Sequence, residues 1–431
     1  MSAIEKKLVD LYFANLDLIE EGVSPVINRY RGDAIQAFNL LGLPSKRIEK
    51  YKYTDISARY DADFEQFFTP FGKWNEAWRP LIEGARVIRL LNGYSYGSET
   101  LTTLENGVVY GSLREAAERL PELVGKYYNQ LADNDSDAIT SLNTAFVQDG
   151  AFVYIPRGVT VEEPFVVLQG YGAEESTQMY GRSLVVAGEN AEANVVFQSQ
   201  AANGNAFLIN QVVEIFAADA ARVEAVEIVS ENDRSTHLSN RFVLQSGNSR
   251  VQAVSVLADG GVVRSNLSAC LAGKGAENHT HGLFIADTGQ HLDCHTQIEH
   301  RVSDCSSFED FRGVASGSGV GAFNGRILVC PDAQRTQAFQ ANHNLLLSDE
   351  AAIYTKPQLE IYADDVKCSH GATVGQLDPE AIFYMRQRGI GEEEARKLQM
   401  YGFVRTIIEK LSVRELADAV DALVTAKIDR L

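Results

Sequence analysis

Cysteine is scarce in this sequence: the 431 residues contain five cysteines, all of them after position 269. Five irregularly spaced cysteines in a long chain do not form the disulfide framework of a small secreted domain. The N-terminal residues lack the apolar segment of a signal peptide, and no stretch reaches the roughly 18 apolar residues of a membrane span. We therefore expect a soluble protein of the reducing cytoplasm that keeps its thiols free.

Basic residues are also in the minority. Lys and Arg together number 39 against 58 Asp and Glu, which gives a net charge of −19. A surface of that sign repels phosphate backbones, so binding to nucleic acid would require a local basic patch. Because no dense basic run with interleaved aromatic residues occurs, nucleic-acid binding is not expected.

The motifs of several common catalytic sites are missing as well. The sequence has no Gly-x-x-x-x-Gly-Lys-Ser/Thr phosphate loop, no Gly-x-Ser-x-Gly nucleophile turn and no dinucleotide-binding Gly-x-Gly-x-x-Gly after a strand. The neighbouring carboxylates Asp364 and Asp365 would point to opposite faces of a strand, which makes them a poor acid–base pair. The sequence therefore indicates a protein that is not an enzyme.

Residues 1–83 have a helical pattern. Apolar residues recur every three to four positions near the N-terminus, and Asp33 is placed to cap a second helix that Gly42 ends. Trp74 and Trp78 are four positions apart, which is typical of packing residues on one helix face.

Residues 84–148 form a transitional segment of mixed α and β character. A turn at Asn106-Gly107 predicts a pair of short strands. The run Ser112–Glu115 matches a capping box that opens a helix, and a further helix is expected from Ser136 to Phe146.

Residues 149–377 contain short β-branched runs that alternate with turns of Gly, Asn, Asp and Ser. Six segments share a small polar turn followed by an alternating strand, and their turns begin at Gly188, Asp219, Gly247, Gly275, Gly319 and Asp349. Most successive turns lie about 28–31 residues apart, with one gap near 44. This period, in units without helices, predicts a parallel β-helix, a solenoid of stacked coils. A β-sandwich is the alternative, but it has turns about every 8–12 residues.

Residues 378–431 are helical again. Asp378 followed by a proline matches a helix start, and residues 392–410 form a second helix. Ser412 opens another capping box and a last helix. Isolated helices of this length are marginal in water, so they are expected to pack on the solenoid or on a partner protein.

Cys368 and His370 are the best candidates for a functional site. At positions i and i+2 of a strand they share one face, with Cα atoms about 7 Å apart. A thiolate and an imidazole can both ligate iron or zinc, and a neighbouring cation would lower the pKa of the thiol. Two ligands do not close a four-coordinate site, so the remaining ligands must come from elsewhere, and a buried structural thiol beside a hydrogen-bonded histidine remains an alternative.

A second group of potential ligands precedes them in the sequence. It comprises His279, His281, His291, Asp293, Cys294, His295, His300 and Cys305. Because the group lacks Cys-x-x-Cys and His-Glu-x-x-His spacing, it favours polar residues on stacked coils over a metal site. His291, His295 and His300 are its weak candidates for metal binding.

Several runs of this sequence resemble the SufB/SufD family of iron–sulfur cluster assembly scaffolds. They are Thr355–Asp378, Phe383–Ile390, Phe323–Gly325, His291–His300 and, near the N-terminus, Gly42–Thr54. The segment Ser348–Thr355 has no cysteine and Gly371 follows His370, and both features are similar to the SufD branch of the family. The sequence departs from that branch at Asp304, where histidine is common, and this weakens any role of Cys305 as a ligand.

The resemblance implies a right-handed parallel β-helix between helical ends. It also implies a heteromeric SUF complex in which the paralogue SufB pairs with the late solenoid strands and the SufC ATPase binds the helices of residues 378–431. A transient iron–sulfur cluster would then form at the SufB interface beside Cys368 and His370, with SufB supplying the missing ligands. For the chain alone, the sequence leaves a homodimer open as an alternative and does not distinguish it from the heteromer.

Two other functions are compatible with a β-helix. One is a carbohydrate-active enzyme such as a polysaccharide lyase; those enzymes are usually secreted, and the lack of a signal peptide argues against it. The other is a solenoid interaction protein that binds no metal and whose cysteines and histidines are only packed. The expected function remains a non-catalytic scaffold subunit for iron–sulfur cluster assembly, with ATP hydrolysis carried out by SufC.

Overall fold

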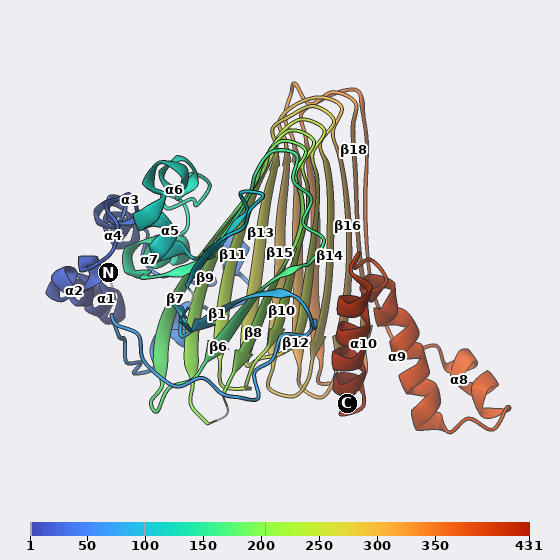
Figure 1. The fold of residues 1–431 in the computed structure, drawn as a ribbon. Helices are drawn as coiled ribbons and strands as arrows, with labels where there is room; N and C mark the ends of the chain where they lie inside the picture. Colours follow the sequence, from blue (N-terminus) through green and yellow to red (C-terminus); the bar gives the residue numbers. More distant parts are fainter. Residues whose placement is uncertain (1, 99, 203) are drawn as a thin grey trace.

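The computed structural model describes residues 2–98, 100–202 and 204–431. Its centre is a solenoid of two facing ten-stranded sheets (Figure 1). The first sheet has the order β2-β1-β6-β8-β10-β12-β14-β16-β18-β20, and the second has the order β19-β17-β15-β13-β11-β9-β7-β5-β4-β3. From β5 onward the pairs are parallel and consecutive strands alternate between the sheets. The predicted parallel β-solenoid is confirmed.

The strands of the solenoid are mostly ten or eleven residues long. Their bounds are β1 Arg86–Leu91, β2 Tyr94–Ser95, β3 Leu101–Thr103, β4 Val109–Ser112, β5 Gly150–Ile155, β6 Phe165–Tyr171, β7 Thr177–Ala187, β8 Glu192–Ala201, β9 Phe207–Ala217, β10 Arg222–Ser230, β11 Thr236–Gln245, β12 Arg250–Asp259, β13 Val262–Leu271, β14 Glu277–Ala286, β15 His291–His300, β16 Ser306–Ala315, β17 Val320–Val329, β18 Thr336–Leu346, β19 Ala352–Ile361 and β20 Val366–Gly375.

The repeat seen in the sequence is the length of one coil. Glu192, Arg222 and Arg250 are ladder neighbours in β8, β10 and β12, so successive coils contain 30 and 28 residues. The gap of 44 is not an insertion, because Gly275 precedes β14 in the first sheet whereas Gly319 precedes β17 in the second. The gap therefore spans one and a half coils.

The turns before β8, β10 and β12 share one backbone conformation. Asn190, Ala220 and Asn248 occupy the same turn position, with φ values of 55°, 57° and 54°. Each of these residues donates its backbone N–H to the turn of the next coil, at 2.9, 2.8 and 2.8 Å. Asn tolerates this left-handed region better than other non-glycine residues, which explains the small polar turns of the sequence.

Seven α-helices precede the main solenoid strands in the described part of the chain. They are α1 Ala3–Ala14, α2 Leu16–Glu20, α3 Pro25–Asn28, α4 Arg31–Leu41, α5 Leu113–Arg119, α6 Pro121–Tyr127 and α7 Ala138–Phe146. The predicted end at Gly42 is confirmed, but α4 begins at Arg31, so Asp33 lies in its first turn and is not its cap. Ser112 accepts a hydrogen bond from the backbone of Glu115, as predicted.

The prediction of a helix through Trp74 and Trp78 is wrong. Residues 60–85 contain no helix, and the two indole rings meet edge to face with centroids 5.3 Å apart. Trp78 lies against Gly170 of β6, where a Cβ atom would come within 2.3 Å of its ring. Nearby prolines and Gly72, whose φ is 84°, disfavour a helix, and packing on the solenoid holds the segment extended.

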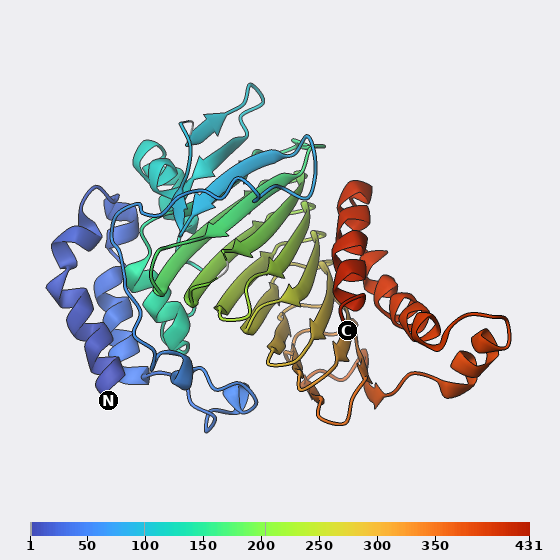
Figure 2. The same cartoon turned by 90° about the horizontal axis from the view of Figure 1, so that it is seen from below.

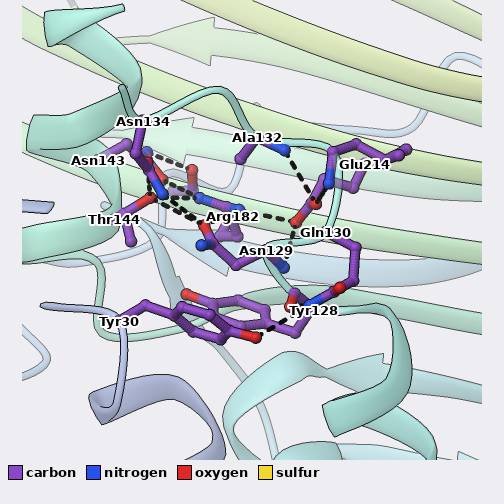
Figure 3. A network of polar contacts seen from close by, with 12 residues as sticks. Tyr30, Tyr128, Asn129, Gln130, Ala132, Asn134, Asn143, Thr144, Arg182 and Glu214 are labelled. Carbon is purple, nitrogen blue, oxygen red and sulfur yellow. Dashed lines mark hydrogen bonds and ion pairs between the residues drawn. The ribbon is translucent and has the colours of Figure 1, made fainter. Parts of the chain in front are cut away.

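A buried ion pair anchors the N-terminal helices on the solenoid (Figure 3). Arg182 of β7 and Glu214 of β9 are 2.7 Å apart, and both side chains are fully buried. Arg182 also donates to Thr144 of α7 at 3.0 Å, while Glu214 accepts the backbone N–H groups of Asn129 and Leu131 at 2.9 and 2.7 Å. The helices therefore dock in one orientation, because any shift would leave buried charges without partners.

Three helices follow the solenoid: α8 Pro379–Arg386, α9 Glu392–Ile408 and α10 Arg414–Ile428. Helices α9 and α10 pack on the outer face of the first sheet, where Val404 and Val420 join the apolar cluster of Val254 and Ile285. Helix α8 has no buried residue and projects away from the solenoid, and the N-terminal and C-terminal helices lie at opposite ends of the sheets (Figure 2). Within the described ranges, no helix is long and apolar enough to cross a membrane.

The caps of the C-terminal helices were predicted only in part. Asp378 accepts the backbone N–H of Glu380 at 2.8 Å and caps α8, as expected. Ser412 does not cap α10, whose N-cap residue is Val413. The backbone N–H and hydroxyl group of Ser412 instead both bind the carboxylate of Glu224 in β10, which ties the α9–α10 connection to the solenoid.

Candidate functional site

The solenoid ends at an open coil. β20 is the last strand of the first sheet and β19 the last strand of the second, so each has only one neighbouring strand among the described residues. The side chains of β20 are exposed or half-buried along its length, whereas the inward side chains of the preceding β18 are almost all buried. Ile361, Tyr362 and Val374 expose 38%, 63% and 43% of their surface at this end.

Cys368 and His370 lie on the inward face of β20. Their ladder neighbours in β18 are Ala338 and Gln340, which are 0% and 4% exposed. Cys368 packs against the apolar interior of the solenoid, and His370 is exposed because no further coil covers it. The predicted shared face of the two residues is confirmed.

The thiol of Cys368 is not activated in this chain. Burial raises its pKa above the ordinary value, and a hydrogen bond from the backbone of Ala338 offsets only part of this effect. The expectation that a neighbouring cation lowers the pKa of this thiol is therefore wrong, because Lys367 lies on the outward face of the strand. The thiol becomes a thiolate ligand only when a metal displaces its proton.

The described residues contain no group of three or more His, Cys, Asp and Glu side chains that could hold a metal ion. Cys368 and His370 are two potential ligands at the open end of the solenoid, and their role in metal binding remains a prediction. Such a pair can bind a metal or a cluster only if a second molecule provides further ligands.

The second group of potential ligands is distributed over separate faces. His291, Asp293 and His295 alternate with inward-facing residues on β15 and lie on the outer face of the second sheet. Cys294 and His300 point inward, where Cys294 is 1% and His300 0% exposed. The remaining members of the group lie elsewhere: His279 and His281 on the outer face of β14, and Cys305 in the turn before β16.

The outer face of β15 is covered by the N-terminal segment that carries the Gly42–Thr54 run. Thr54 contacts both Asp293, at 2.6 Å, and His291, at 2.9 Å. Arg264 of β13 forms an ion pair with Asp293 and donates to the backbone oxygen of Lys50 at 2.7 Å. Two runs that lie about 240 residues apart in the sequence therefore form one buried polar contact.

Burial keeps the histidines of this region neutral. It lowers the pKa of His295 to about 3, with a further contribution from the charge of Arg264. Burial alone lowers the pKa of His300 to about 4, and its Nε2 is 2.9 Å from the hydroxyl group of Ser307. Burial also lowers the pKa of His291. A role of these three histidines in metal binding remains a prediction.

Glu309 and Gln340 lie behind His370 and were not singled out from the sequence. Both point into the solenoid, where they are 3% and 4% exposed. Gln340 donates to the carboxylate of Glu309 at 2.6 Å, and burial raises the pKa of Glu309 to about 7. The signal that could have found them is a polar residue at an inward position of an alternating strand, once the register of the coils is known.

Fold and site together define a β-solenoid protein with two potential metal ligands, Cys368 and His370, at its open end. The family model for the SUF system FeS cluster assembly SufBD core domain matches residues 169–403, and the model for the SufBD N-terminal region matches residues 2–167. The chain therefore belongs to the SufBD family of iron–sulfur cluster assembly proteins.

Curated relatives agree with this assignment. The chain is 28% identical to the iron–sulfur cluster assembly protein SufD of Escherichia coli K12 over 375 residues, which cover 86% of each chain. It is 32% identical to a SufBD family protein of Mycobacterium tuberculosis H37Rv over 387 residues, which cover 87% of this chain and 93% of the relative. It is also 27% identical to SufD of Bacillus subtilis 168 over 75% of each chain. These similarities favour the iron–sulfur function over a carbohydrate-active enzyme.

Proposed function

We propose that this chain is a SufD-type scaffold subunit that supports de novo iron–sulfur cluster formation in the cytoplasm without a catalytic centre of its own. The observation that carries the proposal is the position of Cys368 and His370 on the open face of the last coil. Two ligands on an uncovered face are of use only when another chain completes both the coil and the ligand set. In this proposal the iron–sulfur cluster is the product assembled at the site and is not a permanent cofactor of the chain.

The partner at the open end is SufB, the paralogue of the same family. Strands β19 and β20 each present a free edge, and natural proteins cover or protect such edges because unpaired backbone groups template pairing with another strand. The exposed apolar residues Ile361, Tyr362 and Val374 surround this edge. A second solenoid that continues the coils would bury them and bring its own ligands beside Cys368 and His370.

The SufC ATPase binds the helices of residues 378–431 in this proposal. In helix α8 the side chains of Phe383 and Tyr384 are 62% and 58% exposed. Neighbouring exposed aromatic residues of this kind are typical of a protein interaction site. Between α8, α9 and the turn after β18 lies a groove of about 530 Å³, which Leu347, Ile382 and Arg396 help to line.

We assign residues 149–377 to the β-helix core and residues 1–83 and 84–148 to the regions that precede it.

The proposal is tested by reconstitution with SufB and SufC. Cys368→Ala and His370→Ala are each co-expressed with both partners, and the iron and acid-labile sulfide content of the purified complex is measured. We expect either substitution to lower the cluster content severalfold while the complex still assembles. Ser369→Ala is the matched control, because Ser369 lies between the two residues on the opposite face of β20. Normal cluster content in both variants would show that the site assignment is wrong.

A further inference from the structure

Side chains inside the solenoid stack in columns, with one residue from each coil. One column of the first sheet begins with Phe165, Val195, Ala225 and Ala253 and continues with Thr280, Glu309, Gln340 and His370. Its first four members are apolar, as the interior of a stacked solenoid requires. Its last four members are polar, and the polar part ends at the candidate ligand His370.

The polar part of this column contains an ordered contact directly behind His370. The amide Nε2 of Gln340 donates to Oε2 of Glu309 at 2.6 Å. The other end of the amide, Oε1 of Gln340, is buried and has no hydrogen-bond partner in the described part of the chain. A buried carbonyl oxygen without a partner costs roughly 1–3 kcal/mol, so a native structure that retains one needs a reason for it.

The facing sheet is shaped to receive the Gln340 side chain. Gly325 of β17 lies opposite, and a Cβ atom at this position would come within 2.2 Å of Nε2 of Gln340. The φ of Gly325 does not require glycine, so close approach of the amide is the physical reason for its small size. Gly325 belongs to the Phe323–Gly325 run, whose function the site described above leaves open.

We propose that Gln340 is a positioning residue for His370: its amide, held by Glu309 and seated against Gly325, accepts a hydrogen bond from the imidazole ring. A ring nitrogen that donates to Gln340 carries the proton, and the other nitrogen is then free to bind a metal. The inference rests on the proposed function at one point, namely that the free ring nitrogen of His370 binds a metal. The described contacts do not include this hydrogen bond, and the exposed side chain of His370 has to turn toward Gln340 to form it, which requires no partner protein.

The test observes the ring of His370 directly. The full chain, labelled with ¹⁵N in its histidines, is studied without partners by two-dimensional ¹H–¹⁵N NMR at about pH 8, where an ordinary imidazole is neutral. His370→Gln identifies the signals of His370. In the Gln340→Met variant, which keeps the length of the side chain but removes its amide, we expect the ratio of the two ring tautomers to change about fivefold, as the loss of one hydrogen bond predicts. The matched control is Gln337→Met, on the same strand but exposed on its outer face.

A second pair of variants keeps the test decisive if Gln340→Met does not fold. Glu309→Met leaves Gln340 in place but removes the group that holds its amide, and it should shift the tautomer ratio in the same direction. Glu309→Gln keeps an acceptor for the amide and should restore the ratio of the unmodified chain. Unchanged ratios in Gln340→Met and Glu309→Met overturn the inference. Normal cluster content in both Cys368→Ala and His370→Ala overturns the proposed site instead, whatever the NMR result.

Discussion

Thr54 and Asp293, 239 residues apart in the chain, are joined by a hydrogen bond of 2.6 Å between the Thr54 hydroxyl group and the Asp293 carboxylate. Both residues are almost fully buried, and the same carboxylate neutralises Arg264. The N-terminal segment is thus held on the outer face of the second sheet by one buried charge. That arrangement brings together in space two runs that resemble the family and lie far apart in the sequence.

Replacing Asp293 should release this segment. In Asp293→Asn the buried guanidinium of Arg264 loses its counter-charge, and we expect the free energy of unfolding to fall by about 3 kcal/mol. Chemical denaturation followed by circular dichroism measures the loss, and limited proteolysis should cut first within residues 42–60. Asp332→Asn, at an exposed turn residue, is the control and should change neither readout. An unaltered stability of Asp293→Asn would contradict the role of the ion pair.

The turn at Ala220 offers a stabilising substitution. Its φ of 57° is unfavourable for alanine, whereas the equivalent positions of the neighbouring coils hold Asn190 and Asn248. Ala220→Asn should raise the free energy of unfolding by up to about 1 kcal/mol, and Asn248→Ala should lower it by a similar amount. Thermal unfolding of the two variants measures both effects. Changes of the same sign in the two variants would refute the argument.

Glu309 should make stability depend on pH. Its pKa is raised from the ordinary 4.5 to about 7, so the folded chain binds more protons than the unfolded chain between these values. The favourable contribution of the protonated side chain is fully present below pH 4.5 and is lost as the pH rises through 7. A shift of this size corresponds to about 3 kcal/mol.

Glu309→Gln isolates this contribution, because the amide cannot ionise. The difference in unfolding free energy between Glu309→Gln and the unmodified chain should therefore increase by up to about 3 kcal/mol between about pH 4.5 and pH 8. Urea denaturation at a series of pH values measures it. A difference that is constant with pH would show that Glu309 ionises normally.

The open edge should determine the oligomeric state. In the absence of SufB we expect the 47.4 kDa chain to form a homodimer through β19 and β20. Val374→Lys places a charge on the open face of β20 and should yield a monomer in light scattering after gel filtration. Thr103→Lys, on the edge strand β3 at the other end of the second sheet, should remain a dimer. A monomeric unmodified chain would rule out this use of the edge.

Helix α8 should affect only the binding of SufC. Because Phe383 and Tyr384 are exposed, replacing both with Ala should leave the melting temperature unchanged. We expect the affinity for SufC, measured by isothermal titration calorimetry, to fall at least about tenfold, as the loss of apolar contacts at an interface predicts. Phe13→Ala on α1, 60% exposed at the opposite end of the molecule, is the control. Undiminished affinity would place the SufC contact elsewhere.

Local sequence signals predicted the parts of the fold that local physics determines. The coil period, the helix end at Gly42 and the cap at Asp378 depend on neighbouring residues and are confirmed. Ser412 and Trp78 show where such signals fail. Each has a pattern typical of a helix, but Glu224 and Gly170, both distant in the sequence, provide a more favourable contact.

Only those features of the candidate site that depend on a single strand could be predicted from the sequence. Alternation along β20 indicated that Cys368 and His370 share a face, and this is confirmed. The raised pKa of the Cys368 thiol depends on burial among residues of other coils, which spacing does not reveal. Glu309 and Gln340 lie in one column with His370 only through the register of three strands, and that register is set by the whole stack.

Because the last coil is uncovered, the amount of this chain in the cell should matter relative to the amount of its proposed partner. A molecule synthesised without a partner exposes an unpaired strand edge and apolar residues at this end, and both features favour association with other chains. Such orphan molecules are substrates for self-association and for the proteases that remove incomplete assemblies. If the proposed pairing with SufB is right, the surface that completes the complex would also link the survival of this subunit to the supply of its partner.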